Sequence, residues 1–149
     1  KNGEKPLNHY EGGDMADISA YMAYTSRGNI INIEIPNNME ALDAFEDGKR
    51  LYFTKKGQLN FSCADCHVWQ VGTKLRADIT SPGIGHPTHF PVYRSRAGRL
   101  VTLHERYAGC LNRIRAKPYK GQSKEYRNLE YFMTFMSNGL EINGPGSRK

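Results

Sequence analysis

The chain is short of hydrophobic residues and of cysteine. About 38% of its 149 residues are hydrophobic and three are cysteine, which is a thin apolar supply for one domain of this length. We therefore expect a bound cofactor to fill part of the core. No run approaches the roughly 18 apolar residues that a membrane-spanning helix needs, so a transmembrane segment is excluded.

The sequence also lacks a starting Met and a secretory signal. It begins at Lys1, so we interpret it as a mature or trimmed product, and the missing signal does not argue for a cytoplasmic location. The formal charge of +6 suits an anionic substrate or an acidic protein partner. Because Lys and Arg are spread along the chain without a nucleic-acid-binding signature, no nucleic acid is expected as a partner.

Helical patterns dominate the rest of the chain. Apolar residues recur at helical spacing in four segments: residues 14–27, 38–57, 103–116 and 123–139. The predicted N-caps are Asp14, Asn38 and Ser123, and the predicted stops are Gly28, Gly57 and Gly139. Residues 1–13 are polar, residues 29–36 read as extended, and residues 68–102 read as a long loop rich in Gly and Pro.

The pentapeptide Cys63-Ala64-Asp65-Cys66-His67 matches C-x-x-C-H, the attachment motif of c-type haem. Its two thiols can reach the two vinyl groups of the porphyrin as thioethers, and the histidine is then an axial ligand of the iron. A redox disulfide usually sits in a βαβ context, which is missing here. Zinc would need four ligands, and no second pair is present. We predict one covalently bound haem c, held by Cys63 and Cys66.

The order of the helices agrees with this cofactor. A helix carrying Gly48 precedes the motif, and a helix carrying Tyr131 closes the chain. In small c-type cytochromes these two helices cross with a glycine against an aromatic residue. We therefore predict a mainly α, class I cytochrome-c-like fold around one covalently bound haem, with long loops.

The residues alone leave the second iron ligand open. A simple electron carrier would use Met or His. Met133 and Met136 lie on an apolar helical stripe, where Met is usually core filler. His86, His89 and His104 are more typical of surface or hydrogen-bonding histidines.

Cys110 is the remaining candidate. Attachment of the haem would consume the other two cysteines, so Cys110 would have no disulfide partner within the chain. Helical spacing puts Arg106 and Arg113 on its face, and Lys117 would extend the stripe. Cationic neighbours favour the thiolate, which is both a nucleophile and a good metal ligand.

Two stretches of sequence resemble a known family. ERYAGCLNRIRAKPY, residues 105–119, and EYRNLEYFMTFMSNGLEINGPGSR, residues 125–148, are similar to SoxA, the haem subunit of the SoxAX cytochromes. The resemblance covers the chain from about residue 14 to its end. It implies the second of two cytochrome-c-like lobes, with haem on Cys63 and Cys66 and with His67 and Cys110 as the iron ligands. It also implies a persulfide on Cys110 and an active-site role for Arg106.

The same resemblance implies an activity, partners and a location. SoxA-type enzymes are L-cysteine S-thiosulfotransferases of sulfur oxidation, which join thiosulfate oxidatively to a cysteine of the carrier SoxYZ. Electrons leave through haem to SoxX, a small c-type cytochrome, and the location is the bacterial periplasm. Within this interpretation, Arg113 would join Arg106 in binding thiosulfate, because arginine suits bidentate contacts to oxyanions.

The chain departs from the family by lacking most of the first lobe. We interpret residues 1–36 as a remnant of that lobe, with a helix at about 14–27, plus a linker, and residues 37–149 as the cytochrome c domain. Two alternatives to the transferase remain: a simple electron-transfer cytochrome in which Cys110 is inert, and a thiosulfate dehydrogenase that forms tetrathionate.

Overall fold

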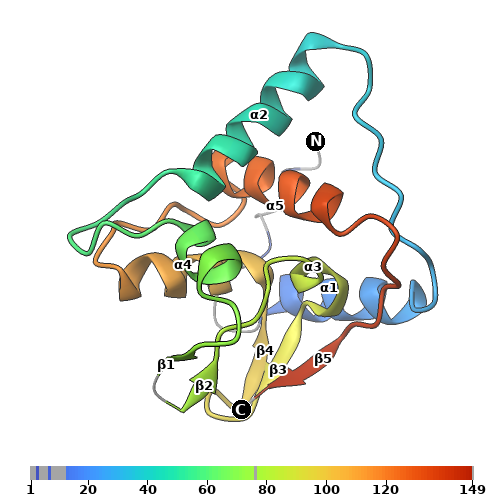
Figure 1. The fold of residues 1–149 in the computed structure, drawn as a ribbon. Helices are drawn as coiled ribbons and strands as arrows, with labels where there is room; N and C mark the ends of the chain where they lie inside the picture. Colours follow the sequence, from blue (N-terminus) through green and yellow to red (C-terminus); the bar gives the residue numbers. More distant parts are fainter. Residues whose placement is uncertain (1–2, 4–6, 8–12, 76, 149) are drawn as a thin grey trace.

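The computed structural model describes residues 3, 7, 13–75 and 77–148, so most of residues 1–13, predicted as polar, lie outside it. Five α-helices and one π-helical turn lie in the described part (Figure 1): α1 (Asp14–Thr25), α2 (Met39–Phe53), η1 (Asp65–Trp69), α3 (His86–His89), α4 (Leu103–Arg113) and α5 (Lys124–Met136). The strands are short: β1 (Lys74–Leu75), β2 (Asp78–Ile79), β3 (Val92–Arg94), β4 (Arg99–Val101) and β5 (Gly146–Arg148). None of the described helices is both long and apolar enough to cross a membrane.

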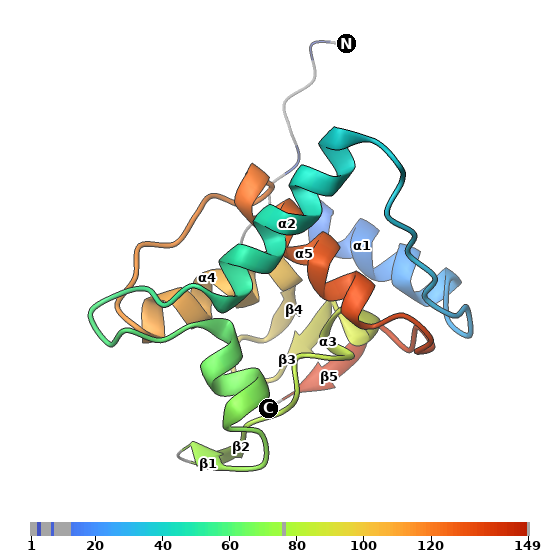
Figure 2. The ribbon, with the colours of Figure 1, turned by 45° about the horizontal axis from the view of Figure 1, so that its top comes forward.

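Helices α2 and α5 cross closely, as the turned view in Figure 2 shows, and their contact holds the main core. The crossing is possible because Gly48 has no side chain: a Cβ there would collide with the backbone carbonyl of Asn128 and lie 3.0 Å from Phe132 Cβ. The predicted crossing of a glycine against an aromatic residue is thus confirmed, but the aromatic residue is Phe132 and not Tyr131. Tyr131 instead packs edge-on against Phe45, with ring centroids 6.2 Å apart.

Two of the three predicted N-caps are confirmed. Asn38 accepts a hydrogen bond from the backbone N–H of Ala41 at 2.8 Å, and Ser123 accepts one from Tyr126 at 3.4 Å. The prediction for Asp14 is wrong, because Gly13 is the N-cap and Asp14 is already the first helical residue.

The predicted helix ends are late by several residues. Helix α1 ends at Thr25 with Ser26 as its C-cap, while Gly28 donates its backbone N–H to Ile142. Helix α2 ends at Phe53, short of Gly57. Helix α4 ends at Arg113 rather than at residue 116, since Arg115 has a φ of 58°, which no α-helix accommodates.

The start of α4 is fixed by a reciprocal capping arrangement. Thr102 accepts from the backbone N–H of Glu105, whose carboxylate accepts from the backbone N–H of Thr102 at 3.1 Å. Arg99 on β4 binds the same carboxylate at 2.9 Å. These contacts fix the helix that carries Cys110 to the neighbouring sheet.

The segment 68–102 is more structured than predicted. It contains the β1–β2 hairpin, α3 and two strands of a three-stranded sheet with the order β4-β3-β5. Strand β3 pairs antiparallel with β4 and parallel with β5. Strands of two or three residues are too short to show an alternating pattern, which is why the sequence predicts only a loop here.

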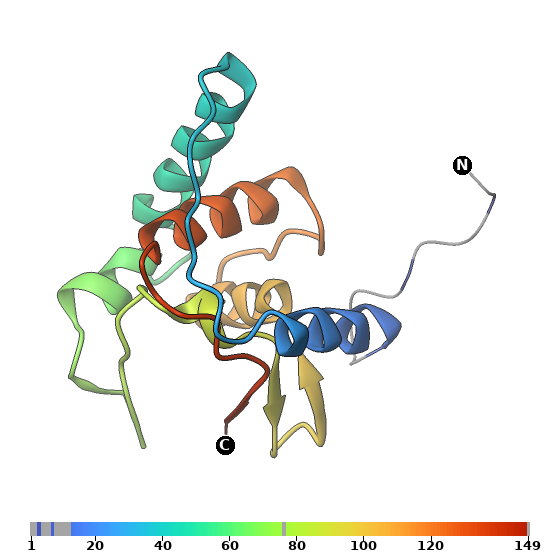
Figure 3. The same cartoon turned by 90° about the vertical axis from the view of Figure 1, so that its right-hand side faces the viewer.

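The N-terminal part of the described chain lies against its C-terminal part (Figure 3). Backbone hydrogen bonds join Ile31 to both Gly139 and Leu140, each at 2.9 Å, and the Asn138 side chain binds both backbone groups of Ile33. Residues 29–36 are extended, as predicted, but form only one isolated bridge, between Ile30 and Glu141.

Candidate functional site

The two cysteines of the C-x-x-C-H motif lie at the start of η1. Asp65 fixes this turn: its carboxylate accepts from the backbone N–H of Ser62 at 2.8 Å and from the Ser62 hydroxyl at 2.7 Å. Cys63 packs against the α2–α5 core, and burial, followed by the charge of Cys110, raises its pKa to about 12. The pKa of Cys66 is also raised, by burial and then by Cys110.

The imidazole of His67 is held in one orientation. Its Nδ1 lies 2.8 Å from the backbone carbonyl of Ser81, and Gly83 donates its backbone N–H to the carbonyl of His67 at 3.0 Å. The His86 ring stands edge-on to it, with centroids 4.7 Å apart. With Nδ1 donating to Ser81, Nε2 is the nitrogen available to a metal.

The side chain of Cys110 lies next to that of His67. The two side chains are hydrogen-bonded, although they lie on η1 and α4 and are 43 positions apart in sequence. Burial by itself would raise the pKa of Cys110, but the hydrogen bond with His67 and the charges of Arg106 and Arg113 outweigh burial, so the pKa is lowered. The site therefore favours a thiolate at this position.

The two predicted arginines both act on this sulfur. Arg106 is half-buried and Arg113 is exposed at the end of α4. Lys117, which was expected to extend the stripe, lies beyond the end of α4, and Arg115 turns toward Gln58, with Nη1 3.5 Å from Oε1. Sequence reasoning missed Arg94, whose charge interacts with Arg106 and Arg113.

Met133 and His104, two other candidates for the second iron ligand, contact other groups of the protein. Met133 is buried, and its sulfur accepts a hydrogen bond from the Tyr107 hydroxyl at 3.2 Å. His104 is buried, with Nδ1 accepting from the backbone of Gln122 at 3.1 Å and Nε2 2.8 Å from Glu130, an ion-pair contact.

The two loop histidines are hydrogen-bonded near the site, and Met136 packs at the edge of the core. His86 Nε2 lies 2.9 Å from the Ser81 hydroxyl, and His89 Nδ1 lies 3.0 Å from the Gly85 carbonyl. Burial, followed by the charges of His67 and His89, lowers the pKa of His86 to about 3.

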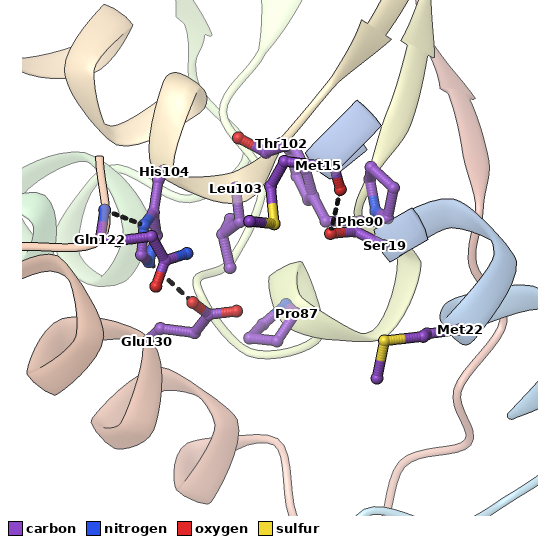
Figure 4. A pocket seen from close by; sticks show the side chains of 11 residues that line it. Met15, Ser19, Met22, Pro87, Phe90, Thr102, Leu103, His104, Gln122 and Glu130 are labelled. Carbon is purple, nitrogen blue, oxygen red and sulfur yellow. Dashed lines mark hydrogen bonds and ion pairs between the residues drawn. The ribbon is translucent and has the colours of Figure 1, made fainter. Parts of the chain in front are cut away.

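A cavity of about 250 Å³ lies between α1, α3, α4 and α5 (Figure 4). Met15, Met22 and Phe90 form much of its apolar wall, and the pair His104–Glu130 forms its polar side. No residue of the C-x-x-C-H motif lines it, and neither does Cys110. The cavity is therefore separate from the site predicted at the C-x-x-C-H motif and Cys110.

The residues around the motif fit a covalently bound haem. Two adjacent thiols, an imidazole with Nε2 available and a facing thiolate-prone cysteine are a donor set for haem c. The buried Tyr52 hydroxyl has no hydrogen-bond partner among the described residues, and Gly83 lies against it. Since an unpaired buried hydroxyl costs about 1–3 kcal/mol, a bound group carrying an acceptor would satisfy it.

Comparisons with known proteins agree with this fit. The family described as SoxA/TsdA, cytochrome c domain, matches residues 47–142. The chain is 56% identical over 149 residues to the L-cysteine S-thiosulfotransferase subunit SoxA of Allochromatium vinosum, covering 99% of this chain and 53% of that protein. It is 54% identical over 148 residues to the corresponding subunit of Chlorobaculum tepidum, covering 99% of this chain and 51% of that protein.

A solved structure shows the same fold. A chain of the SoxXA crystal structure from P. pantotrophus superposes with a TM-score of 0.84 at 34% identity, covering 91% of this chain and 50% of that one. The predicted mainly α cytochrome c fold is thus confirmed. The chain spans about half the length of the curated relatives it matches.

Proposed function

Because the chain belongs to the SoxA/TsdA cytochrome c domain family, we propose that it is the second haem lobe of a SoxA-type L-cysteine S-thiosulfotransferase. The observation that supports this best is the contact between Cys110 and His67, since an electron carrier would use Met or His opposite the motif histidine. The names of its relatives point to the same activity.

A cytochrome c domain implies haem c, and the sequence holds one C-x-x-C-H motif. We therefore infer one haem per chain, with Cys63 and Cys66 as the thioether residues and with His67 and Cys110 as the axial ligands. The Ser81 carbonyl would keep the His67 ring in its ligating orientation. When bound, haem c supplies a one-electron acceptor beside the reacting sulfur.

The chain's own residues would bind and orient thiosulfate. Arg106 and Arg113 attract the dianion and bind its sulfonate oxygens, which leaves the outer sulfur directed at Cys110. The Cys110 thiolate forms a sulfur–sulfur bond to that outer sulfur, with loss of two electrons. The product is Cys110–S–S–SO₃⁻.

The second half of the reaction is a thiol–disulfide exchange. The thiolate of the carrier's cysteine attacks the outer sulfur, the bond to Cys110 breaks, and the Cys110 thiolate is regenerated. Overall, a carrier thiol and thiosulfate give the carrier–S–S–SO₃⁻ conjugate, one proton and two electrons.

The partners follow from this reaction. A SoxX-like c-type cytochrome would accept the electrons, and a SoxYZ-like protein would present its cysteine to the site, in the periplasm. The P. pantotrophus structure contains SoxXA, which supports a SoxX-like partner. The net charge of +6 would assist the approach of thiosulfate and of acidic partners.

The variant Cys110→Ser tests the proposal. We expect covalent haem content to stay at the wild-type level, because the attachment residues are unchanged, while formation of the carrier conjugate is abolished. The measurements are mass spectrometry of the carrier after incubation with thiosulfate and an electron acceptor, and low-temperature EPR of the haem. Asn112→Ser, on an exposed position of the same helix, is the matched control.

Full conjugation by Cys110→Ser would refute the role of Cys110, and a wild-type protein that forms neither the conjugate nor tetrathionate would be an electron carrier. Tetrathionate formed in place of the conjugate by the wild-type protein would assign it instead as a thiosulfate dehydrogenase.

A further inference from the structure

Three arginines lie opposite one another across the end of the three-stranded sheet. The register of β3 pairs Arg94 with Arg99 on β4 and with Arg148 on β5. Residues paired directly across strands project to the same face, and like charges in such positions repel. The row therefore gathers positive charge at one end of the sheet, and Glu105 already balances part of it by pairing with Arg99.

The two outer arginines have structural contacts. Arg99 binds Glu105 at 2.9 Å, at the start of α4. Arg148 Nη2 lies 3.3 Å from His89 Nε2, and its Nη1 donates to the Ser147 carbonyl at 3.4 Å. These contacts tie Arg99 to α4 and Arg148 to α3.

The central arginine is linked to α4 through its neighbour, because its cross-strand partner Arg99 binds Glu105, which directly precedes Arg106 on that helix. Side chains alternate along a strand, and Val92 is buried while Tyr93 is exposed, so Arg94 shares the inward face with Val92. Burial, followed by the charges of Arg106 and Arg113, lowers the pKa of Arg94, while the carboxylate of Asp78 opposes this shift. These are the two arginines whose charges also act on Cys110.

We propose that Arg94 is a third substrate-binding residue, which joins Arg106 and Arg113 in holding the sulfonate oxygens of thiosulfate while the outer sulfur faces Cys110. This inference rests on the proposed function and deepens it, because it extends the anion site from α4 to the sheet. Three guanidiniums offer more donors than two, and their mutual repulsion is relieved when a dianion binds.

The test compares Arg94→Gln with Arg96→Gln in the haem-loaded protein. Arg96 is exposed two residues further along, so its variant makes the same change in net charge. We expect Arg94→Gln to weaken thiosulfate binding about tenfold by titration calorimetry, with a raised KM and little change in kcat. Arg96→Gln should change binding less than about twofold. Arg94→Lys, which keeps the charge but not the fork of donors, should give an intermediate loss.

Inorganic sulfate, an oxyanion without the outer sulfur, is the second probe and should show the same order of variants. Haem content and circular dichroism check that each variant is folded. The difference between the two Gln variants should persist at high salt, because a direct contact is screened less than a surface field.

Several outcomes would overturn the inference. These are wild-type affinity in Arg94→Gln, equal losses in both Gln variants that vanish at high salt, or a wild-type protein that binds neither anion. A wild-type protein that binds thiosulfate but forms no conjugate would instead refute the proposed function, and the affinities of the variants would still decide the role of Arg94.

Discussion

At the scale of single residues, the site depends on which sulfur and nitrogen atoms already have partners. The Met133 sulfur accepts a hydrogen bond from the Tyr107 hydroxyl, and both nitrogens of His104 are in contact with other groups. Cys110 instead contacts His67. These contacts favour Cys110 over Met133 and His104 as the second iron ligand, a choice that residue type alone leaves open.

The first prediction concerns Met133. We expect Met133→Leu to leave the haem spectrum and the low-spin EPR signal unchanged, because this sulfur is bound to Tyr107. The free energy of unfolding should fall by about 1–3 kcal/mol, since the buried Tyr107 hydroxyl loses its acceptor. Denaturant unfolding of the haem-loaded protein measures the loss.

Met136→Leu is the control, because it is a swap of similar volume at the edge of the core and should cost less than about 1.5 kcal/mol. A changed low-spin signal in either variant would identify that methionine as an iron ligand and remove Cys110 from that position.

At the scale of secondary-structure elements, the α2–α5 crossing packs against the site. Gly48 lets the two helices approach, and Tyr52, one turn further along α2, lies against Gly83 next to His67. The crossing thus reaches the motif through a chain of direct contacts, and a change in helix separation would be felt at the imidazole.

The second prediction follows from this crossing. Gly48→Ala should destabilise the protein by about 2 kcal/mol or more, because the added Cβ meets the backbone carbonyl of Asn128, which cannot rotate away. The gain in helix propensity, about 1 kcal/mol, offsets only part of this. Thermal and denaturant unfolding measure the change.

Lys49→Ala is the matched control on the next, solvent-facing position, and its effect should stay within about 0.5 kcal/mol. Equal stability of Gly48→Ala and wild type would mean that the two helices can separate without loss.

The features that could be predicted from sequence are those that depend on local spacing. The C-x-x-C-H motif, the shared face of Arg106, Cys110 and Arg113, and the caps at Asn38 and Ser123 all involve residues within a few positions of one another. A helix has one spacing rule, so these neighbours could be inferred without knowing the fold.

Other features depend on long-range packing and gave no such signal. Arg94 belongs to a three-residue strand, which has too few residues to show a period. Ser81 orients His67 through its backbone carbonyl, a group that every residue carries. The partner of Gly48 was misassigned because the register of a helix crossing is set by tertiary packing.

At the scale of the whole molecule, the hydrogen bonds of residues 28–33 bear on where the cytochrome c domain begins. The sequence predicts a boundary between residues 36 and 37, but residues 28–33 are hydrogen-bonded to residues 138–142. Ile31 is also buried. We propose that residues 28–36 belong to the domain and that α1 alone is the remnant of the preceding lobe.

The third prediction compares two shortened chains. Residues 37–149 should be less stable than residues 28–149 by about 3 kcal/mol or more, because the shorter chain loses several backbone hydrogen bonds and the buried Ile31 side chain. Denaturant unfolding of the two haem-loaded chains measures the difference. Equal midpoints and slopes would place the boundary back at residue 37.

The nearness of Cys110 to both attachment cysteines, seen in its effect on their pKa values, has a consequence for biogenesis. In an oxidising compartment, three neighbouring thiols allow three wrong disulfides before the cofactor arrives. If Cys63 and Cys66 carry the haem as proposed, thioether formation would remove these two thiols and would thereby also protect Cys110 from forming a disulfide. On the proposed function, haem attachment would therefore have to be faster than oxidation of the thiols, because a disulfide that includes Cys110 would block the proposed reactive sulfur.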